Sequence, residues 1–213
     1  MSFDYWNRKY RRKGLIWGKA PTTGVKVFAE HLRARGKTRV LEVGCGYGRD
    51  SAYLAEKGCL VTGVDSSEAA VELAREIWKE LPAVFIQGKG EALEFEDRSF
   101  EGVWSSNFLH LFRREKRGTI MEEMKRILDK GGLLGFSVAS TRDPGYRRGE
   151  GEVLGPRTLV VEGKVMHFFD EEEVLDTMKG FNILEAKEVW EAEKHASGAI
   201  HRHVNWAVVG EKR

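Results

Sequence analysis

A short apolar run that breaks into a glycine-rich loop sets strong limits on the fold of this chain. Residues 40–43 (VLEV) lead directly into residues 44–48 (GCGYG). This pattern is typical of a buried strand entering a tight turn, since glycine adopts positive φ at low steric cost. Residues 50–57 then place apolar side chains on one helical face, and residues 60–64 form a second apolar run that ends at Asp65. The sequence predicts a strand–loop–helix–strand unit with an acid closing its second strand.

The alternation of strand-like and helix-like segments continues along the chain. The further elements that we expect are a helix over 68–80, strands over 83–86 and 100–105, a helix over 113–128 that Gly131 and Gly132 end, a strand over 133–138, a helix over 170–179, and strands over 181–191 and 201–209 joined near Ser197 and Gly198. Strands that alternate with helices form a parallel sheet covered on both faces, and a closing strand pair with no helix between must be antiparallel. The sequence therefore predicts a doubly wound α/β fold, with a seven-stranded, mostly parallel sheet and an antiparallel C-terminal strand.

The glycine loop is the expected ligand site, because ligands of open parallel sheets lie beyond the carboxyl ends of the strands. Asp65, at the end of the neighbouring strand, can accept hydrogen bonds from both hydroxyls of a ribose. Dinucleotide sites need G-x-G-x-x-G, whereas this loop runs G-x-G-x-G with Arg49 at the third glycine position. The phosphate-loop pattern G-x-x-x-x-G-K-[ST] is absent from the chain. These observations indicate a nucleoside-bearing cofactor other than NAD or ATP.

The pattern Glu42-x-Gly44-x-Gly46-x-Gly48 resembles class I S-adenosylmethionine (SAM)-dependent methyltransferases, and residues 40–140 are similar to that family. The resemblance implies a Rossmann-like methyltransferase fold, SAM as cofactor and S-adenosylhomocysteine as product. It also implies that the glycines pass under the methionine and ribose, that Glu42 orders the loop or the cofactor's amino group, and that Asp65 binds the ribose. The predicted cofactor-binding residues are Glu42, Gly44, Cys45, Gly46, Gly48, Arg49, Asp65, Ser66, Gly90, Glu91 and Ser105.

The adenine contact departs from the family pattern. Lys89 stands where the family normally has an aspartate, so Glu91 or the backbone near Gly90 would take that role. Ser105, at the end of the fourth expected strand, would face the reacting sulfonium together with Ser106 and Asn107. Cys45 is interpreted as a small packing residue in the cofactor loop rather than a nucleophile.

A narrower resemblance links the chain to the tellurite-resistance and thiopurine-type (methyltransferase type 11/12-like) branch. Its basis is Gly48-Arg49-Asp50-Ser51-Ala52-Tyr53-Leu54-Ala55, an aromatic N-terminal segment and the strand His201-Arg202-His203. The resemblance implies a lid over the active site. The predicted substrate-binding residues are Trp6, Tyr10, Trp17 and His201, and the predicted catalytic residues are His110, His203 and Asn107.

Each of these assignments has a structural alternative. The aromatic side chains can simply cover the sheet, because aromatics bury large areas. His201 and His203 share one face of a strand and can be surface residues, substrate-site residues or metal ligands. No metal is predicted, since no ligand spacing supports one. His110 lies in a loop that borders the expected methyl group, where it can act on the acceptor or cap and pack locally.

Composition narrows the class of protein. The 213 residues carry 35 Lys+Arg against 33 Asp+Glu, a net charge of +2, too balanced to indicate a protein that coats nucleic acid. The two cysteines exclude a disulfide scaffold, and no apolar run is long enough to span a membrane. The single glutamine and four asparagines resemble the composition of heat-adapted proteins. We expect one cytoplasmic domain over 1–213, monomeric or homodimeric, with a helical lid segment (1–36), a cofactor-binding core (37–140), and a substrate-side loop with C-terminal strands (141–213).

Several functions remain compatible with these motifs. The favoured one is transfer of a methyl group to a small-molecule acceptor by in-line displacement, since the tetrapeptide that grips planar amino groups is absent. A thiolate or chalcogen anion would need no general base, whereas a hydroxyl or amine could use His110 or His203. The basic clusters Arg8–Lys13 and Arg142–Arg148 are solvated loops or a rim that attracts an anionic substrate. The alternatives are an RNA or protein methyltransferase and a non-catalytic SAM-binding protein.

Overall fold

A seven-stranded sheet dominates the computed structural model, which describes residues 3–149, 151–194 and 200–213. In these ranges the strand order is β3-β2-β1-β4-β5-β10-β9. All neighbours are parallel except that β10 runs antiparallel to both β5 and β9. The strands are β1 (Arg39–Val43), β2 (Leu60–Asp65), β3 (Ala83–Gln87), β4 (Phe100–Ser106), β5 (Leu128–Ala139), β9 (Phe181–Lys194) and β10 (Ile200–Lys212). The predicted fold class and the reversed C-terminal strand are confirmed.

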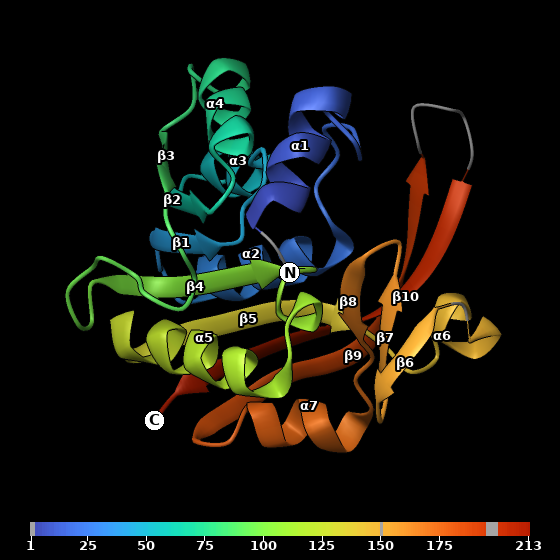
Figure 1. Ribbon diagram of the computed structural model, residues 1–213. Helices are drawn as coiled ribbons and strands as arrows, with labels where there is room; N and C mark the ends of the chain where they lie inside the picture. The colour runs from blue at the N-terminus through green and yellow to red at the C-terminus, as the bar shows by residue number, and fades with distance from the viewer. Residues whose placement is uncertain (1–2, 150, 195–199) are drawn as a thin grey trace.

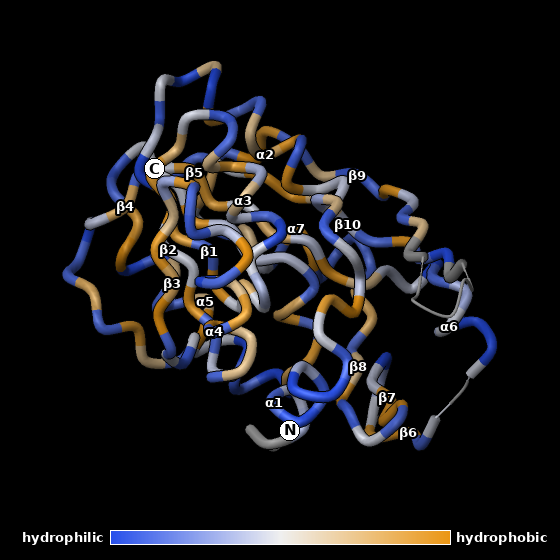
Figure 2. Tube along the Cα trace, turned by 90° about the horizontal axis from the view of Figure 1, so that it is seen from above, coloured by the Kyte–Doolittle hydropathy of each residue, from blue (hydrophilic) through white to orange (hydrophobic). Residues whose placement is uncertain are grey.

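Helices cover both faces of this sheet (Figure 1). On one face lie α2 (Thr23–Ala34), α3 (Arg49–Glu56) and α4 (Glu68–Ile77), and on the other lie α5 (Arg114–Ile127) and α7 (Glu171–Thr177). The first face packs around Phe28 and Trp104, whose rings stack at 5.2 Å, and the second around the α5 side chains Ile120 and Met124. Figure 2 shows hydrophobic colour around the inner strands such as β2 and β3, and hydrophilic colour over α1 (Phe3–Lys13). No helix in the described part of the chain is long and apolar enough to cross a membrane.

The connection between α5 and β5 differs from the sequence expectation. Gly131 and Gly132 were expected to end the helix, but α5 ends at Ile127 and β5 begins at once with Leu128. Leu128 is fully buried and pairs with Phe100 of β4, and this pairing draws the chain into the sheet before the glycines are reached. The glycines instead lie within β5, where Gly131 adopts a φ of 64°.

A second, three-stranded antiparallel sheet was not predicted. It consists of β6 (Glu152–Gly155), β7 (Thr158–Val161) and β8 (Lys164–His167), and follows the short helix α6 (Pro144–Arg148). Figure 1 places this small sheet beside the carboxyl end of β5. His167 of β8 contacts Glu173 of α7 at 2.8 Å, and Arg117 of α5 contacts the same carboxylate at 2.8 Å. These contacts fix the small sheet to the helices below the large one.

Asp50 connects the N-terminal segment to the core. Its carboxylate is 1% exposed and accepts hydrogen bonds from the Thr22 amide at 2.8 Å, the Thr22 hydroxyl at 2.6 Å and Trp104 Nε1 at 3.0 Å. Thr22 is the residue that caps α2. One buried carboxylate thus fixes the starts of α2 and α3 against β4.

Candidate active site

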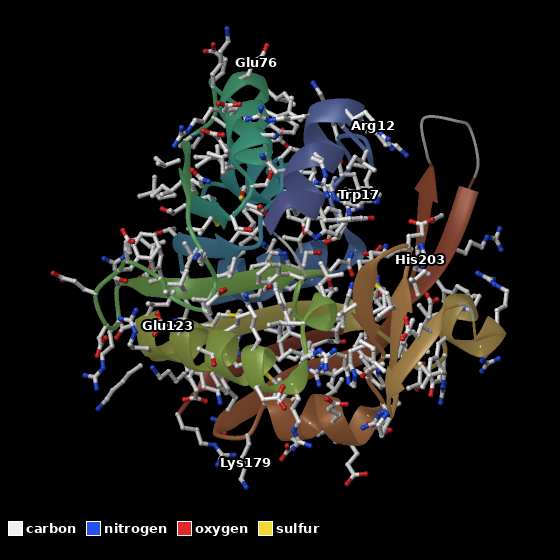
Figure 3. The ribbon with its side chains drawn as sticks, viewed as in Figure 1. Arg12, Trp17, Glu76, Glu123, Lys179 and His203 are labelled. Carbon is white, nitrogen blue, oxygen red and sulfur yellow. The ribbon has the colours of Figure 1, made fainter. Side chains whose placement is uncertain are left out.

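A cavity of about 750 Å³ opens at the carboxyl ends of the parallel strands. The glycine loop and the ends of β2 and β4 line one part of it, and α1 covers that part. The other part is lined by β8, the start of α6, and His203 and Asn205 of β10. In Figure 3, Trp17 and His203 lie at the same end of the molecule, although they are far apart in the chain. The cavity therefore joins residues from the whole length of the chain.

The glycine loop has a backbone conformation that residues with a Cβ rarely adopt. Gly44 has a φ of 75°, and a Cβ there would lie 2.3 Å from Cδ2 of Phe108. Gly48 has a φ of 77° and is the N-cap residue before α3, and a Cβ there would lie 2.5 Å from Cε1 of Phe85. The loop is pinned to β2 because the Gly44 amide donates to the Val64 carbonyl at 2.8 Å. This loop, called the glycine cradle below, therefore presents bare backbone to the aromatic rings that pack on it, and Gly44 and Gly46 line the cavity.

Asp65 organises the same cradle. One carboxylate oxygen accepts a hydrogen bond from the Gly46 amide at 2.8 Å, and the other accepts one from the Ser67 amide at 2.8 Å. Burial raises the pKa of Asp65, and the two amides partly offset that rise. Each oxygen can accept a further hydrogen bond, and Asp65 lines the cavity. This geometry suits a pair of ribose hydroxyls.

Glu42 lies deeper in the cavity wall. It is 2% exposed and accepts a hydrogen bond from the Ser51 hydroxyl. Burial and the negative charge of Asp50 raise the pKa of Glu42 well above its usual value. A buried acid whose pKa is raised in this way is suited to receive a positively charged ligand group.

Replacing Glu42 by glutamine is expected to stabilise the ligand-free protein by about 1 kcal/mol near neutral pH. A carboxyl whose folded pKa lies above its unfolded value binds more protons when folded, so the natural protein loses stability as pH rises through the folded pKa. The glutamine variant has no such loss and still accepts the Ser51 hydrogen bond. Thermal unfolding from pH about 4 to about 8 measures the difference. Identical pH profiles of the two proteins would contradict the assignment.

The expected adenine end of the cavity is apolar. Phe108 and Phe112, whose rings lie 4.7 Å apart, line it together with Gly88, Lys89 and Gly90. Glu91 also lines the cavity, but Lys116 contacts its carboxylate at 2.6 Å. Burial alone would raise the pKa of Glu91, but the hydrogen bond from Lys116, a backbone hydrogen bond and the charges of Lys116 and Lys89 together outweigh it, so the pKa is lowered. The aromatic side chains were missed from the sequence, where an apolar pair after a strand has no distinctive spacing.

The aromatic residues of the N-terminal segment cover the cofactor half of the cavity. Trp6, Tyr10 and Trp17, the three aromatic residues predicted to bind substrate, all line it. Tyr10 packs edge-on to Tyr47 at 6.0 Å, and its hydroxyl would lie 2.7 Å from a Cβ at Gly46. Tyr10 therefore lies over the glycine loop rather than over the part of the cavity that β8 and β10 line.

Of the three predicted residues at the end of β4, two line the cavity and one does not. Asn107 lines the cavity at a φ of 50°, and its buried Oδ1 has no hydrogen-bond partner among the described residues. Ser106 lines the cavity too. Ser105 is fully buried away from it, and its hydroxyl donates to the Val43 carbonyl at 2.9 Å, so this side chain joins β4 to β1. The period of two along a strand explains why Ser105 points the other way from its neighbour.

His110 lines the cavity but is not arranged as a base. Its Nδ1 accepts a hydrogen bond from the Ala139 amide at 3.1 Å, so the ring hydrogen lies on Nε2. Burial, reinforced by the positive charge of Lys164, lowers the pKa of His110 to about 3. The geometry fits a neutral hydrogen-bond donor.

The remaining predicted residues divide between the cavity, its surroundings and the part of the chain that is not described. Those that line the cavity are Gly44, Cys45, Gly46, Arg49, Ser66, Gly90 and His203. Gly48 supports the loop from outside the lining. The side chain of His201 and the Ser197–Gly198 turn lie outside the described residues. Asp143, which contacts His203 Nδ1 at 3.2 Å, was not predicted.

Comparisons with known proteins agree with this geometry. Residues 40–132 match a family model described as a methyltransferase domain. The chain is 34% identical over 124 residues to glycine/sarcosine/dimethylglycine N-methyltransferase of Actinopolyspora halophila, covering 55% of the chain and 21% of the relative. It is 28% identical over 184 residues to methyltransferase GfsG of Streptomyces halstedii, covering 80% and 62%. The matched region is thus less than two thirds of the length of either relative.

Solved structures show the same fold. The PH0226 protein of Pyrococcus horikoshii superposes with a TM-score of 0.70 at 23% identity, covering 97% of this chain and 99% of that one. A Burkholderia thailandensis 1,6-didemethyltoxoflavin-N1-methyltransferase, solved with 1,6-didemethyltoxoflavin and S-adenosylhomocysteine bound, superposes with a TM-score of 0.64 at 21% identity, covering 89% and 78%. None of these matches tests the narrower tellurite-resistance and thiopurine-type branch, which stays a prediction.

Proposed function

We propose that this chain, whose residues 40–132 match a methyltransferase domain, is a class I SAM-dependent methyltransferase that transfers the methyl group of SAM to a small-molecule acceptor by in-line displacement. One observation carries the proposal. The glycine cradle and Asp65 line one part of the cavity, the cofactor half. The residues around His203 line the other part of the same cavity, the acceptor half. A cofactor bound in the first part and an acceptor bound in the second would therefore lie in contact inside one cavity.

The residues present fit SAM. Asp65 offers lone pairs for the ribose hydroxyls, Glu42 a buried acid for the amino group, and Phe108 an apolar wall for the adenine. Glycine at position 44 lets the Phe108 ring pack directly against the loop, where a Cβ would clash with it. When bound, SAM supplies a methyl group on a positively charged sulfur. The chain then contributes alignment of the acceptor and exclusion of water.

The size and enclosure of the cavity support a small acceptor. Its volume of about 750 Å³ falls in the range typical of small-molecule sites. Residues of α1 and of the small sheet form its walls, so a large polymer would meet them before the cradle. Relatives named as acting on small molecules include a fatty-acid O-methyltransferase of Mycolicibacterium smegmatis, 32% identical over 106 residues.

The test of the function is transfer of a radiolabelled methyl group from SAM to a fractionated cell extract, with SAM affinity measured beside it by calorimetry. We expect SAM to bind and the label to appear in the small-molecule fraction. Label in RNA or protein would replace the small acceptor with a macromolecule. Tight binding with no label in any fraction would favour the non-catalytic SAM-binding alternative, and no binding would contradict the cofactor site itself.

RNA is the second candidate, and one surface favours it. Arg142, Arg147 and Arg148 border a separate hollow of about 390 Å³ next to Trp190, which is 66% exposed. Arginine beside an exposed indole suits a phosphate backbone and a stacked base. Substrate binding that weakens steeply with salt would support RNA over a small acceptor.

A further inference from the structure

Asp143 is a buried acid in the acceptor half of the cavity. It is 3% exposed and caps α6, accepting a hydrogen bond from the Gly145 amide at 2.7 Å. The Val204 amide of β10 donates to its other oxygen, Oδ2, at 2.9 Å. The same oxygen lies 3.2 Å from Nδ1 of His203. Two backbone amides from separate elements therefore fix the carboxylate against the imidazole.

This contact determines which nitrogen of His203 carries the hydrogen. Burial alone would raise the pKa of Asp143, but hydrogen bonds from His203, Val204 and Gly145 outweigh it and lower the pKa. An ionised carboxylate only accepts hydrogen bonds, so Nδ1 of His203 must be the donor. In the neutral ring Nε2 is then the basic nitrogen. His203 lines the cavity with its side chain 39% exposed.

His110 has the opposite arrangement in the same chamber. Its Nδ1 accepts from the Ala139 amide, so its Nε2 carries a hydrogen and donates. The two rings lie close enough for the charge of His203 to lower the pKa of His110. One histidine is therefore set as a donor and the other as an acceptor, a pair suited to hold a hydroxyl or amine from both sides.

We propose that the acceptor is a neutral hydroxyl or amine compound and that His203, positioned by Asp143, removes its proton during methyl transfer. The inference rests on the proposed function and deepens it. The nucleophile's lone pair forms a bond to the methyl carbon, and the carbon–sulfur bond breaks with its electron pair going to sulfur. The O–H or N–H proton passes to Nε2 of His203, giving an imidazolium that Asp143 stabilises and that later loses the proton to solvent. His203 is the catalytic residue and Asp143 the positioning residue.

Charged groups from several elements set the pH at which His203 works. The carboxylate of Asp143 favours the imidazolium, while positive charges in the same cavity wall disfavour it. Across the hairpin, β9 places an acid directly opposite His203 in the strand register. Among the described residues, the charged and titratable groups that line this part of the cavity or lie opposite His203 in the hairpin include Asp143 and Arg148 at α6, His110 after β4, Glu162 and Lys164 at β8, and Glu191 on β9.

The first experiment measures S-adenosylhomocysteine formation against pH with individual small phenols, primary amines and thiols as acceptors. We expect turnover with a phenol or amine, rising with pH as one group deprotonates. His203→Gln should lower kcat by about 10²-fold or more and remove that rise, with KM for SAM unchanged. His31→Gln is the matched control, because His31 also pairs with an acid, Glu185 at 3.7 Å, but lies on α2.

The Asp143→Asn variant distinguishes a role of Asp143 in positioning His203 from a role in folding alone. An amide can donate to Nδ1 and stabilise the wrong tautomer of His203, so we expect a loss of kcat with a shifted pH profile, while SAM affinity stays as in the natural protein. A merely structural role would lower stability and SAM affinity together and leave the profile of the remaining activity in place. That result, or turnover of thiols alone with a His203→Gln variant of full activity, would overturn the proposal.

A second measurement needs no acceptor. The ¹⁵N spectrum of the His203 ring, recorded in the full chain with S-adenosylhomocysteine added, reports the tautomer directly. We expect the neutral form to carry its hydrogen on Nδ1, and Asp143→Asn to lower the pKa of the ring. A hydrogen on Nε2 in the natural protein would overturn the proposal. Failure to bind S-adenosylhomocysteine would instead count against the proposed function.

Discussion

Replacing Asp65 by alanine is expected to weaken the binding of SAM by about 10²- to 10⁴-fold. A hydrogen bond to a charged group is worth about 1.5–3 kcal/mol, and the carboxylate is placed to accept one from each ribose hydroxyl. The variant also releases the Gly46 and Ser67 amides that the carboxylate holds at 2.8 Å, which loosens the loop under the ligand. Titration calorimetry with SAM and with S-adenosylhomocysteine measures the change.

Two variants make this result interpretable. Asp65→Asn keeps one acceptor oxygen and should lose less affinity than the alanine variant. Glu76→Ala removes a carboxylate from the exposed side of α4, labelled in Figure 3, and should leave the affinity unchanged. Unaltered SAM binding by Asp65→Ala would place the ribose elsewhere in the cavity.

Removing the carboxylate of Asp50 should be the most destabilising of the substitutions considered. Asp50→Ala leaves the Thr22 amide, the Thr22 hydroxyl and Trp104 Nε1 without their acceptor in a region closed to water. Each unsatisfied buried donor costs about 1–3 kcal/mol, so we expect a loss of about 3–5 kcal/mol in the free energy of unfolding. For a chain of this size the melting temperature should fall by roughly 10 °C. Urea unfolding followed by circular dichroism checks both values.

Asp97→Ala serves as the comparison for Asp50→Ala. The side chain of Asp97 is 72% exposed and pairs with Arg126 at the surface. Exposed pairs contribute little, so its loss should cost less than about 1 kcal/mol. If the two variants unfold at the same urea concentration, the three hydrogen bonds to Asp50 do not hold α2 against the sheet.

The large sheet was predictable because its signals are local. Residues 40–43 and 60–64 are short apolar runs bounded by glycines, and helices of regular periodicity separate the strands. The small sheet was not predictable in the same way. Its strands, such as Lys164–His167, have four residues each and alternate weakly, and they are held by contacts such as His167 with Glu173 on α7.

The two halves of the site also differ in how local their sequence signals are. The glycine cradle and Asp65 lie within about two dozen residues and have a recognisable spacing. Asp143 has no such signal, because Asp-Pro-Gly suggests only a helix start, and its partner His203 is 60 residues further along the chain. His110 was predicted to be catalytic and lines the cavity, but only the structure reveals that its Nδ1 is already occupied by the Ala139 amide.

The place of β10 between β5 and β9 has a consequence for how the chain folds. Residues 39–107 carry the whole glycine cradle and are synthesised well before His203 and Asn205. The nascent protein therefore has the parts to hold a nucleoside before it has a complete acceptor wall. Until β10 inserts, β5 presents an open edge that can pair with a foreign strand. Mutations that slow this insertion would raise aggregation during synthesis while leaving the finished molecule unchanged.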